Sequence, residues 1–277
     1  ESSFNKCSRL KIIKFSKDSN LRYIEHNTFN SVNQLEEILI PPSVTKICED
    51  AFHFCASLAK VEIPKNSNLQ TIEKDVFSFS NIEEIFIPSG LVNLEKGWLK
   101  DASKLTNIII SPSNGQFIFK DGKYLLGKSD PNNDEFDTLL YIRNGIKKIS
   151  IQTNIKIIGS YSFYSSNIEI IFVPPSVTKI CNYSFSNCGE LRKFDISANS
   201  NLQIIEKSAF FNSGIKDISI PASVEQIGEF AFSFCFELII VEISEESRLK
   251  SIPISTFYNS PMAIVMIPPS LKKLINF

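Results

Sequence analysis

The chain has 277 residues, of which 43% are hydrophobic and 21% charged, and its formal net charge is −1. This length supports a large core in one or two domains. The near-neutral charge argues against nucleic acid or an anionic membrane as the main partner, since both attract a basic face. No apolar run approaches the roughly 18 residues of a membrane span, so we expect no membrane insertion by this segment.

A hydrophobic hexad of the form LxxIxI recurs along the whole chain, as at Leu35, Ile38 and Ile40. Successive hexads start 22 to 25 residues apart, except for one step of 41 residues between Leu105 and Ile146. Short pieces of alternating apolar and polar residues predict strands, and a fixed period predicts a repeat array. The hexads start at Leu10, Leu35, Leu58, Ile82, Leu105, Ile146, Ile168, Leu191, Ile215, Leu238 and Met262.

Each regular unit continues in the same way after its hexad. A turn that is often rich in proline, such as residues 40–43, stops the strand, and a second apolar pair such as Val44 and Ile47 predicts a second short strand. A large apolar residue then follows, and small residues before it, such as Ala51 before Phe52, favour a short helical turn that places a ring in the core. This large residue is Phe29, Phe52, Phe77, Leu99, Phe163, Phe185, Phe210, Phe232 or Phe257.

Two stretches show how literal the repetition is. Residues 35–55 read LEEILIPPSVTKICEDAFHFC, and residues 168–188 read IEIIFVPPSVTKICNYSFSNC. With residues 215–235 they follow the pattern LxxIxIPxxVxxIxxxAFxxC, which resembles the BspA-like class of leucine-rich repeats, found on bacterial and protist cell surfaces. The resemblance covers essentially the whole chain apart from one insertion.

The resemblance implies a leucine-rich-repeat solenoid. We expect a right-handed superhelix of ~23-residue coils, with a parallel β-sheet on one face, short second strands and short helical turns, mainly β with minor α. It also implies a secreted or surface-displayed protein that attaches to other proteins or to host cells. The chain opens with Glu-Ser-Ser and its first methionine is Met262, so we expect any signal peptide or anchor to lie outside this segment.

The long step between repeats contains an insertion. Asp121-Gly122, between residues 117–120 and 123–126, predicts a tight hairpin, because this dipeptide adopts the positive φ values of a type I′ turn. A polar loop over 129–137 and a returning strand over 138–142 are expected to follow. We therefore predict one solenoid domain over 1–277, with a hairpin-type insertion at 111–142 between repeat blocks 1–110 and 143–277. The loop's DPNNDE stretch lacks the glycine and distal glutamate of an EF-hand, which favours a plain loop over a calcium site.

The sequence contains no pattern that predicts catalysis. It has two histidines, His26 and His53, and lacks HExxH, GxSxG, GxGxxG and Walker A sequences. Carboxylate pairs such as Glu36/Glu37 recur in step with the repeat, which is typical of solvated strand positions. We predict that the chain is not an enzyme and uses no catalytic residue, cofactor or metal.

Four of the six cysteines occupy one repeat position, three residues after a phenylalanine, where other units carry Ser, Ala or Val. This predicts a small, mostly buried packing position. Cys48 and Cys181 lie seven residues before Cys55 and Cys188, so bridges within these two pairs are one alternative and free thiols the other. The spacing does not suggest zinc, which prefers CxxC-type clusters. The four equivalent cysteines are Cys7, Cys55, Cys188 and Cys235.

The third and fifth residues of each hexad point away from the core and are the predicted binding surface. Charged and apolar residues roughly alternate in these two columns, and the apolar ones form three groups. Exposed apolar residues on a sheet often mark protein contacts, although strands also tolerate such residues without a partner. The three groups are Leu39, Phe86 and Ile109; Ile170 and Phe172; and Ile240, Ile264 and Met266.

Three functional interpretations remain open. The first is a non-enzymatic module that binds a protein partner, such as a host extracellular-matrix or cell-surface protein, through the strand face. The second is a structural or antigenic spacer, and the third an intracellular scaffold, which free cysteines would suit. Asn182 begins the only N-x-S/T sequon, a weak indication of glycosylation and secretion. Neither end carries a polar capping unit, and the last residues are Leu274-Ile275-Asn276-Phe277, which predicts further repeats or end-to-end self-association.

Overall fold

The structure is a computed structural model that describes residues 1–253, 255–269, 271 and 273–274. The chain forms two compact units, Glu1–Gly127 and Lys128–Phe277, and each is described by itself. Residues 275–277, on which the prediction of end-to-end association partly rests, lie outside the described residues. The assignment of 1–277 to one domain, with an insertion at 111–142, stays a prediction.

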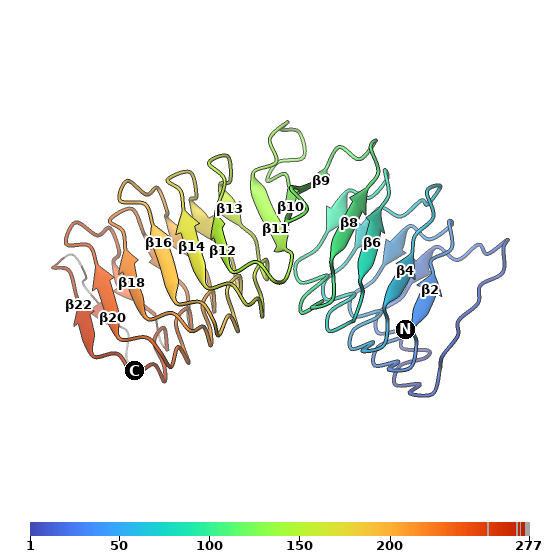
Figure 1. The fold of residues 1–277 in the computed structure, drawn as a ribbon, viewed down its shortest axis with the longest axis horizontal. Coiled ribbons are helices and arrows are strands. Elements are labelled where there is room, and N and C mark those ends of the chain that lie inside the picture. Colours follow the sequence, from blue (N-terminus) through green and yellow to red (C-terminus); the bar gives the residue numbers. More distant parts are fainter. Residues whose placement is uncertain (254, 270, 272, 275–277) are drawn as a thin grey trace. The chain divides into compact units, whose positions relative to one another are not determined.

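The first unit stacks its repeats as two columns of parallel strands (Figure 1). The hexads form a four-stranded sheet of β2 (Glu37–Leu39), β4 (Lys60–Glu62), β6 (Glu84–Ile87) and β8 (Asn107–Ile110). The second apolar pairs form another sheet of β1 (Tyr23–Ile24), β3 (Lys46–Ile47), β5 (Thr71–Ile72) and β7 (Asn93–Leu94).

The second unit has the same two columns. Its hexads form two three-stranded parallel sheets, one of β12 (Lys148–Ser150), β14 (Ile170–Val173) and β16 (Lys193–Ile196), and one of β18 (Asp217–Ile220), β20 (Ile240–Ile243) and β22 (Ile264–Met266). The second column pairs β11 (Thr138–Ile142), β13 (Ile157–Ile158), β15 (Lys179–Ile180), β17 (Ile204–Ile205) and β19 (Gln226–Ile227) in parallel. Strands β21 (Ser251–Ile252) and β23 (Lys273–Leu274) pair separately.

Burial follows the hexad pattern. Leu35, Ile38 and Ile40 are at most 2% exposed, whereas Glu37 and Leu39 between them face solvent. Because side chains alternate across a strand, the first, fourth and sixth hexad residues fill the interior of each coil. This confirms the predicted solenoid with parallel sheets.

The expected short helical turns are not helices, and the described residues contain no α-helix. In the coil of Phe52, the amides of Ala51 and His53 donate to carbonyl groups three residues back, while those of Asp50, Phe52 and Phe54 donate to the next coil. Asp50 and Phe54 adopt φ values of 58° and 56°. Successive amides thus alternate between donating within the coil and donating to the next coil. This alternation requires the left-handed residues, and such residues interrupt a helix. The described residues therefore include no helix that could cross a membrane.

The large residue of each turn forms a stack of aromatic rings inside each unit. Phe29, Phe52 and Phe77 stack with centroids 5.2 and 5.5 Å apart in the first unit. Phe185 and Phe210 belong to the longer stack in the second. A coil therefore cannot bury its ring completely without its neighbours, which is the cooperative principle of a repeat array.

The insertion begins with the predicted hairpin. Strands β9 (Phe117–Lys120) and β10 (Tyr124–Gly127) pair antiparallel. Asp121 and Gly122 between them have φ values of 54° and 60°, as the turn requires. The expected strand over 138–142 is β11, which pairs in parallel with β13 and so belongs to the second column of its unit.

Candidate functional site

The predicted binding residues of the first unit lie on the outer face of its hexad sheet. Phe86 on β6 lies directly opposite Ile109 on β8, so these two form a pair. Leu39 on β2 lies opposite Glu62, which separates it from that pair. Leu39 is 50% and Ile109 44% exposed, whereas Phe86 is half-buried. The first apolar group is thus divided by a carboxylate.

The group on β14 is less available than its sequence suggests. Ile170 and Phe172 are both half-buried. The ammonium groups of Lys148 and Lys193, on the two neighbouring strands, lie 5.3 and 5.6 Å from the centre of the Phe172 ring. Both ammonium groups are within the range of cation–π contacts with the ring, so the ring and its two cations together form the surface here.

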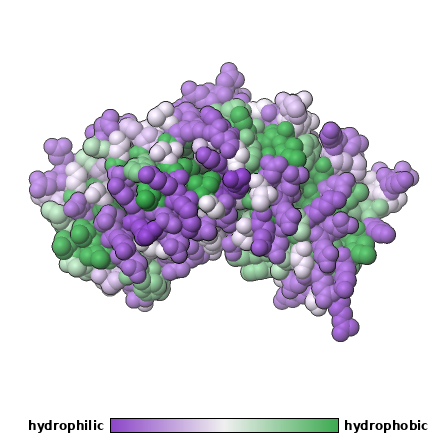
Figure 2. Space-filling model, in the orientation of Figure 1, coloured by the Kyte–Doolittle hydropathy of each residue, from purple (hydrophilic) through white to green (hydrophobic). Residues whose placement is uncertain are grey.

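The third group lies on the last two hexad strands of the second unit. Ile240 on β20 lies opposite Ile264 on β22, and Met266 lies opposite Glu242. Ile264 and Met266 are 50% and 52% exposed, and Ile240 is half-buried. Figure 2 shows hydrophobic surface over β20 and β22 within a largely hydrophilic face. Val265 and Ile267 are also exposed, but they are the fourth and sixth residues of their hexad and so lie on the opposite face of β22 from Ile264 and Met266.

An open groove of about 550 Å³ adjoins this group. Met266 belongs to both, and the groove follows the carboxyl ends of β16, β18, β20 and β22 and the turns after them. Three carboxylates, Glu242, Glu245 and Glu246, line it together with Ile243 and other apolar side chains. The sequence does not predict the groove, because it is formed by turns from three coils together with Met266 on a fourth.

Exposed aromatic side chains on the turns were also missed. Phe54 is 48% exposed and stacks on Phe79 with centroids 4.6 Å apart, and Tyr258 is 58% exposed beside Phe234. Phe54, Phe79 and Phe234 each follow a core phenylalanine by two residues. That recurrence is a property of the sequence itself.

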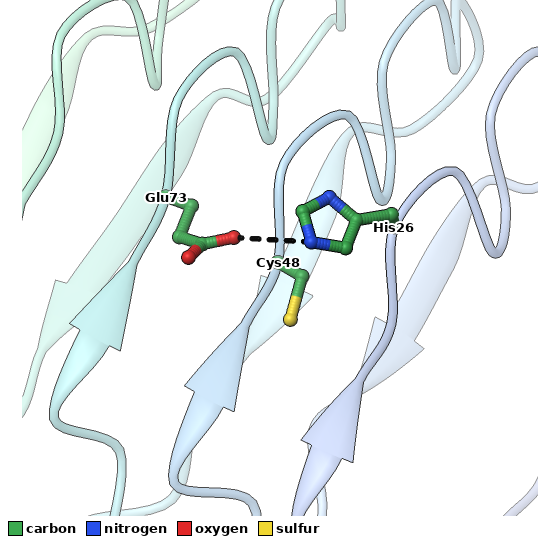
Figure 3. A group of neighbouring side chains, drawn as sticks. All are labelled: His26, Cys48 and Glu73. Atoms are coloured by element: carbon green, nitrogen blue, oxygen red, sulfur yellow. Dashed lines mark ion pairs between the residues drawn. The ribbon is translucent and has the colours of Figure 1, made fainter. Parts of the chain in front are cut away.

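One group of potential metal donors occurs in the described part of the chain. His26, Cys48 and Glu73 directly follow, or lie one residue beyond, strands β1, β3 and β5, and their side chains converge (Figure 3). Their donor atoms all lie within 4.8 Å of one another. Cys48 is 22 positions after His26, and Glu73 is 25 positions after Cys48. Because of these long spacings, no local sequence motif predicts the group.

The cysteines are all free thiols, which decides between the two alternatives left open by the sequence. Cys55, Cys188 and Cys235 are buried as expected, and the thiol of Cys55 donates to the carbonyl oxygen of Phe29. Cys7 differs, because it lies in the first, partial coil and is exposed. Asn182 is half-buried after β15, and its glycosylation stays a prediction.

One protein-family profile matches most of the chain. The profile of the BspA type leucine-rich repeat region matches in six copies, over residues 1–123 and 156–276. The chain belongs to the BspA-type leucine-rich-repeat family. This BspA-type chain has no match among curated proteins.

Solved structures resemble this BspA-type chain in fold. The pneumococcal vaccine antigen PcpA is 24% identical, with a TM-score of 0.77 over 93% of this chain and 60% of its own. A leucine-rich cell surface protein from Faecalibacterium prausnitzii A2-165 is 22% identical, with a TM-score of 0.76 over 97% and 69%. A leucine-rich-repeat protein from Eubacterium ventriosum is 18% identical, with a TM-score of 0.63 over 92% and 78%. The BspA-type chain thus spans about 60% of the length of PcpA.

Proposed function

We propose that this chain is a non-enzymatic protein-binding module of a cell-surface or secreted leucine-rich-repeat protein. Membership of the BspA-type family and the fold shared with a vaccine antigen and a cell surface protein support this placement. The binding surface is the outer face of the hexad sheets. The partner is a protein, with host extracellular-matrix and cell-surface proteins as the first candidates.

The apolar surface of β20 and β22 carries the proposal. Ile264 and Met266 are each about half exposed and lie in register with Ile240 and Glu242. When a partner covers these aliphatic side chains, they lose contact with water. This burial stabilises the complex by roughly 25 cal/mol per Å² of apolar area. Single exposed apolar residues elsewhere on the surface, such as Val92, are ordinary for a folded protein.

The adjoining groove specifies the chemistry of the partner. Glu242, Glu245 and Glu246 bring negative charge to a wall that also contains Ile243 and Met266. Charge complementarity steers association and selects partners. The fitting partner segment therefore combines apolar side chains with lysine or arginine.

A structural or antigenic spacer is the second candidate function. The stacked coils, which repeat the same contacts along both units, suit such a role without any ligand. An intracellular scaffold is the third, and the free thiols of all six cysteines are compatible with it. Binding measurements separate the module from the other two.

The test measures binding of the purified chain to immobilised matrix proteins and to epithelial cells. The variant Ile264→Glu/Met266→Glu places two charges on the apolar surface, and Val92→Glu, at a residue 58% exposed outside the strand face, is the control. We expect saturable binding that the double variant loses and the control keeps. Saturable binding retained by both variants would move the site away from β20 and β22. Absence of saturable binding by the unmodified chain would favour the spacer.

A further inference from the structure

The backbone of three successive coils brings His26, Cys48 and Glu73 together. The amide of Cys48 donates to the carbonyl of Ile24 at 2.8 Å, and the amide of Glu73 donates to that of Ile47 at 3.0 Å. These ladder bonds fix adjacent coils about 4.8 Å apart. Cys48 consequently lies in the middle coil, with the imidazole reaching it from one side and the carboxylate from the other (Figure 3).

The carboxylate of Glu73 is oriented before any ligand arrives. Its Oε1 lies 2.5 Å from the Lys46 ammonium. Its Oε2 accepts a hydrogen bond from the amide of Glu49 at 2.9 Å and lies 3.9 Å from Nε2 of His26. A carboxylate oxygen has two lone-pair directions, so Oε2 keeps one for a further partner on the histidine side.

A carboxylate adjoins the Cys48 thiol. The donor oxygen of Glu73 lies within 4.8 Å of the Cys48 sulfur. A divalent cation bound between these two groups would displace the thiol proton and would be attracted by the carboxylate.

The second unit contains an internal comparison. Lys179 lies 2.6 Å from Glu206 beside Cys181, and the amide of Asn182 donates to the Glu206 carboxylate. The lysine, cysteine and glutamate thus recur as a structural element that orients the turn. The position of His26 is different, because Ser160 occupies it in the second unit. The lysine, cysteine and glutamate therefore form their structural element in the second unit without a histidine, so His26 is not needed for that structural role.

We propose that His26 Nε2, Cys48 Sγ and Glu73 Oε2 bind one divalent transition-metal ion, most suitably zinc. A nitrogen, a thiolate and a carboxylate oxygen are the donors that zinc accepts. Bond lengths of about 2.0–2.3 Å place tetrahedral donors roughly 3.3–3.8 Å apart. The 3.9 Å between Nε2 and Oε2 is already close to that spacing, so side-chain rotations complete the site.

Two properties follow from three protein ligands. The fourth tetrahedral position stays open for water or for a donor group of a binding partner. In addition, the ion ties three consecutive coils together, so it stabilises the folded first unit by mass action. Lys46 keeps its contact with Oε1 while Oε2 ligates.

The experiment compares the unmodified chain with His26→Ser, Cys48→Ser and Cys181→Ser. His26→Ser installs the residue that the second unit has, and its side chain is 42% exposed, so the variant is expected to fold. Cys181→Ser removes the matching cysteine that has no histidine. Zn²⁺ affinity is measured by competition with a chromophoric chelator, and Co²⁺ is added separately to record its absorption spectrum.

We expect one equivalent of Zn²⁺, and a Co²⁺ spectrum with a thiolate charge-transfer band and intense tetrahedral visible bands. His26→Ser and Cys48→Ser should each weaken binding at least about 10-fold, since even outer-shell substitutions cost that much. Cys181→Ser should bind like the unmodified chain. Zn²⁺ should also raise the Tm of the unmodified chain and of Cys181→Ser, but not that of His26→Ser. A missing thiolate band, a band that persists in Cys48→Ser, or equal affinity in all four proteins would overturn the proposal.

Discussion

The ring of Phe185 stacks on the ring of Phe210 in the next coil, with centroids 5.0 Å apart and planes inclined by 15°. Phe163 stacks on the other side of Phe185 at 4.7 Å. The Phe185 ring therefore contacts the core rings of the coils on both sides, so removing it leaves a cavity between coils.

We predict that Phe185→Ala lowers the free energy of unfolding by about 3–5 kcal/mol, the usual cost of truncating a buried phenylalanine. Phe185→Leu should cost less, because Leu99 occupies the equivalent position in the first unit. Urea unfolding followed by circular dichroism measures both. Phe211→Ala is the control, since Phe211 is next to the stack but only half-buried. A loss below about 1 kcal/mol for Phe185→Ala would contradict the role of the stack.

Gly228 is required by the close approach of two coils. A Cβ atom at this residue would lie 2.3 Å from the backbone nitrogen of Lys207 in the preceding coil. Gly228→Ala should destabilise the protein by about 1–3 kcal/mol, because the coils must separate. Gly189→Ala is the matched control, since its Cβ would meet nothing within 4 Å. Thermal unfolding of the two variants should differ, and equal Tm values would refute the explanation.

The thiols should differ in reactivity. Burial raises the pKa of Cys55 and of Cys188 to about 12, and thiolate is the reactive form, whereas Cys7 is exposed. A thiol reagent at mildly alkaline pH should label one cysteine quickly in the native protein and six after denaturation without reductant. Cys7→Ser should remove the fast phase. Fewer than six labelled thiols in the denatured protein would reveal a bridge.

Asp137 closes the polar loop of the insertion. Its side chain is 1% exposed and accepts hydrogen bonds from the amide and hydroxyl of Ser129 at 2.8 and 2.7 Å. Burial alone raises the pKa of Asp137, but the Ser129 hydrogen bonds and the Lys156 charge outweigh it, so the pKa lies below the ordinary 3.8. Because the folded-state pKa is the lower one, the stabilisation is complete above pH 3.8 and disappears as pH falls through the folded-state pKa.

We therefore predict that Asp137→Asn costs about 1–3 kcal/mol at neutral pH. The difference in Tm between the unmodified chain and this variant should shrink as pH falls below 3.8, the ordinary pKa. Asp134→Asn, in the exposed part of the same loop, should leave Tm unchanged across the pH range. A Tm difference for Asp137→Asn that does not depend on pH would show that the carboxylate charge is not what stabilises the loop.

The apolar surface of β20 and β22 illustrates what could be predicted of the site. Ile264 and Met266 were recognised because the hexad register determines which residues face outward. The register could not show that Lys148 and Lys193 flank Phe172, since that depends on the conformations of long side chains on neighbouring strands. The turns were misjudged for a related reason. Local preference favoured a helical turn, but hydrogen bonds to the next coil select the left-handed residues Asp50 and Phe54.

The sequence by itself determined the repeat, the buried positions of each coil and the solenoid fold, because a short period in hydrophobicity is a local property that every unit repeats. Only the tertiary structure decided that His26, Cys48 and Glu73 converge and that turns from three coils form a groove with Met266. These arrangements join residues on different coils, at distances set by the stacking of strands and the reach of individual side chains. Neither the stacking distance nor the reach of a side chain can be derived from the local pattern of residues.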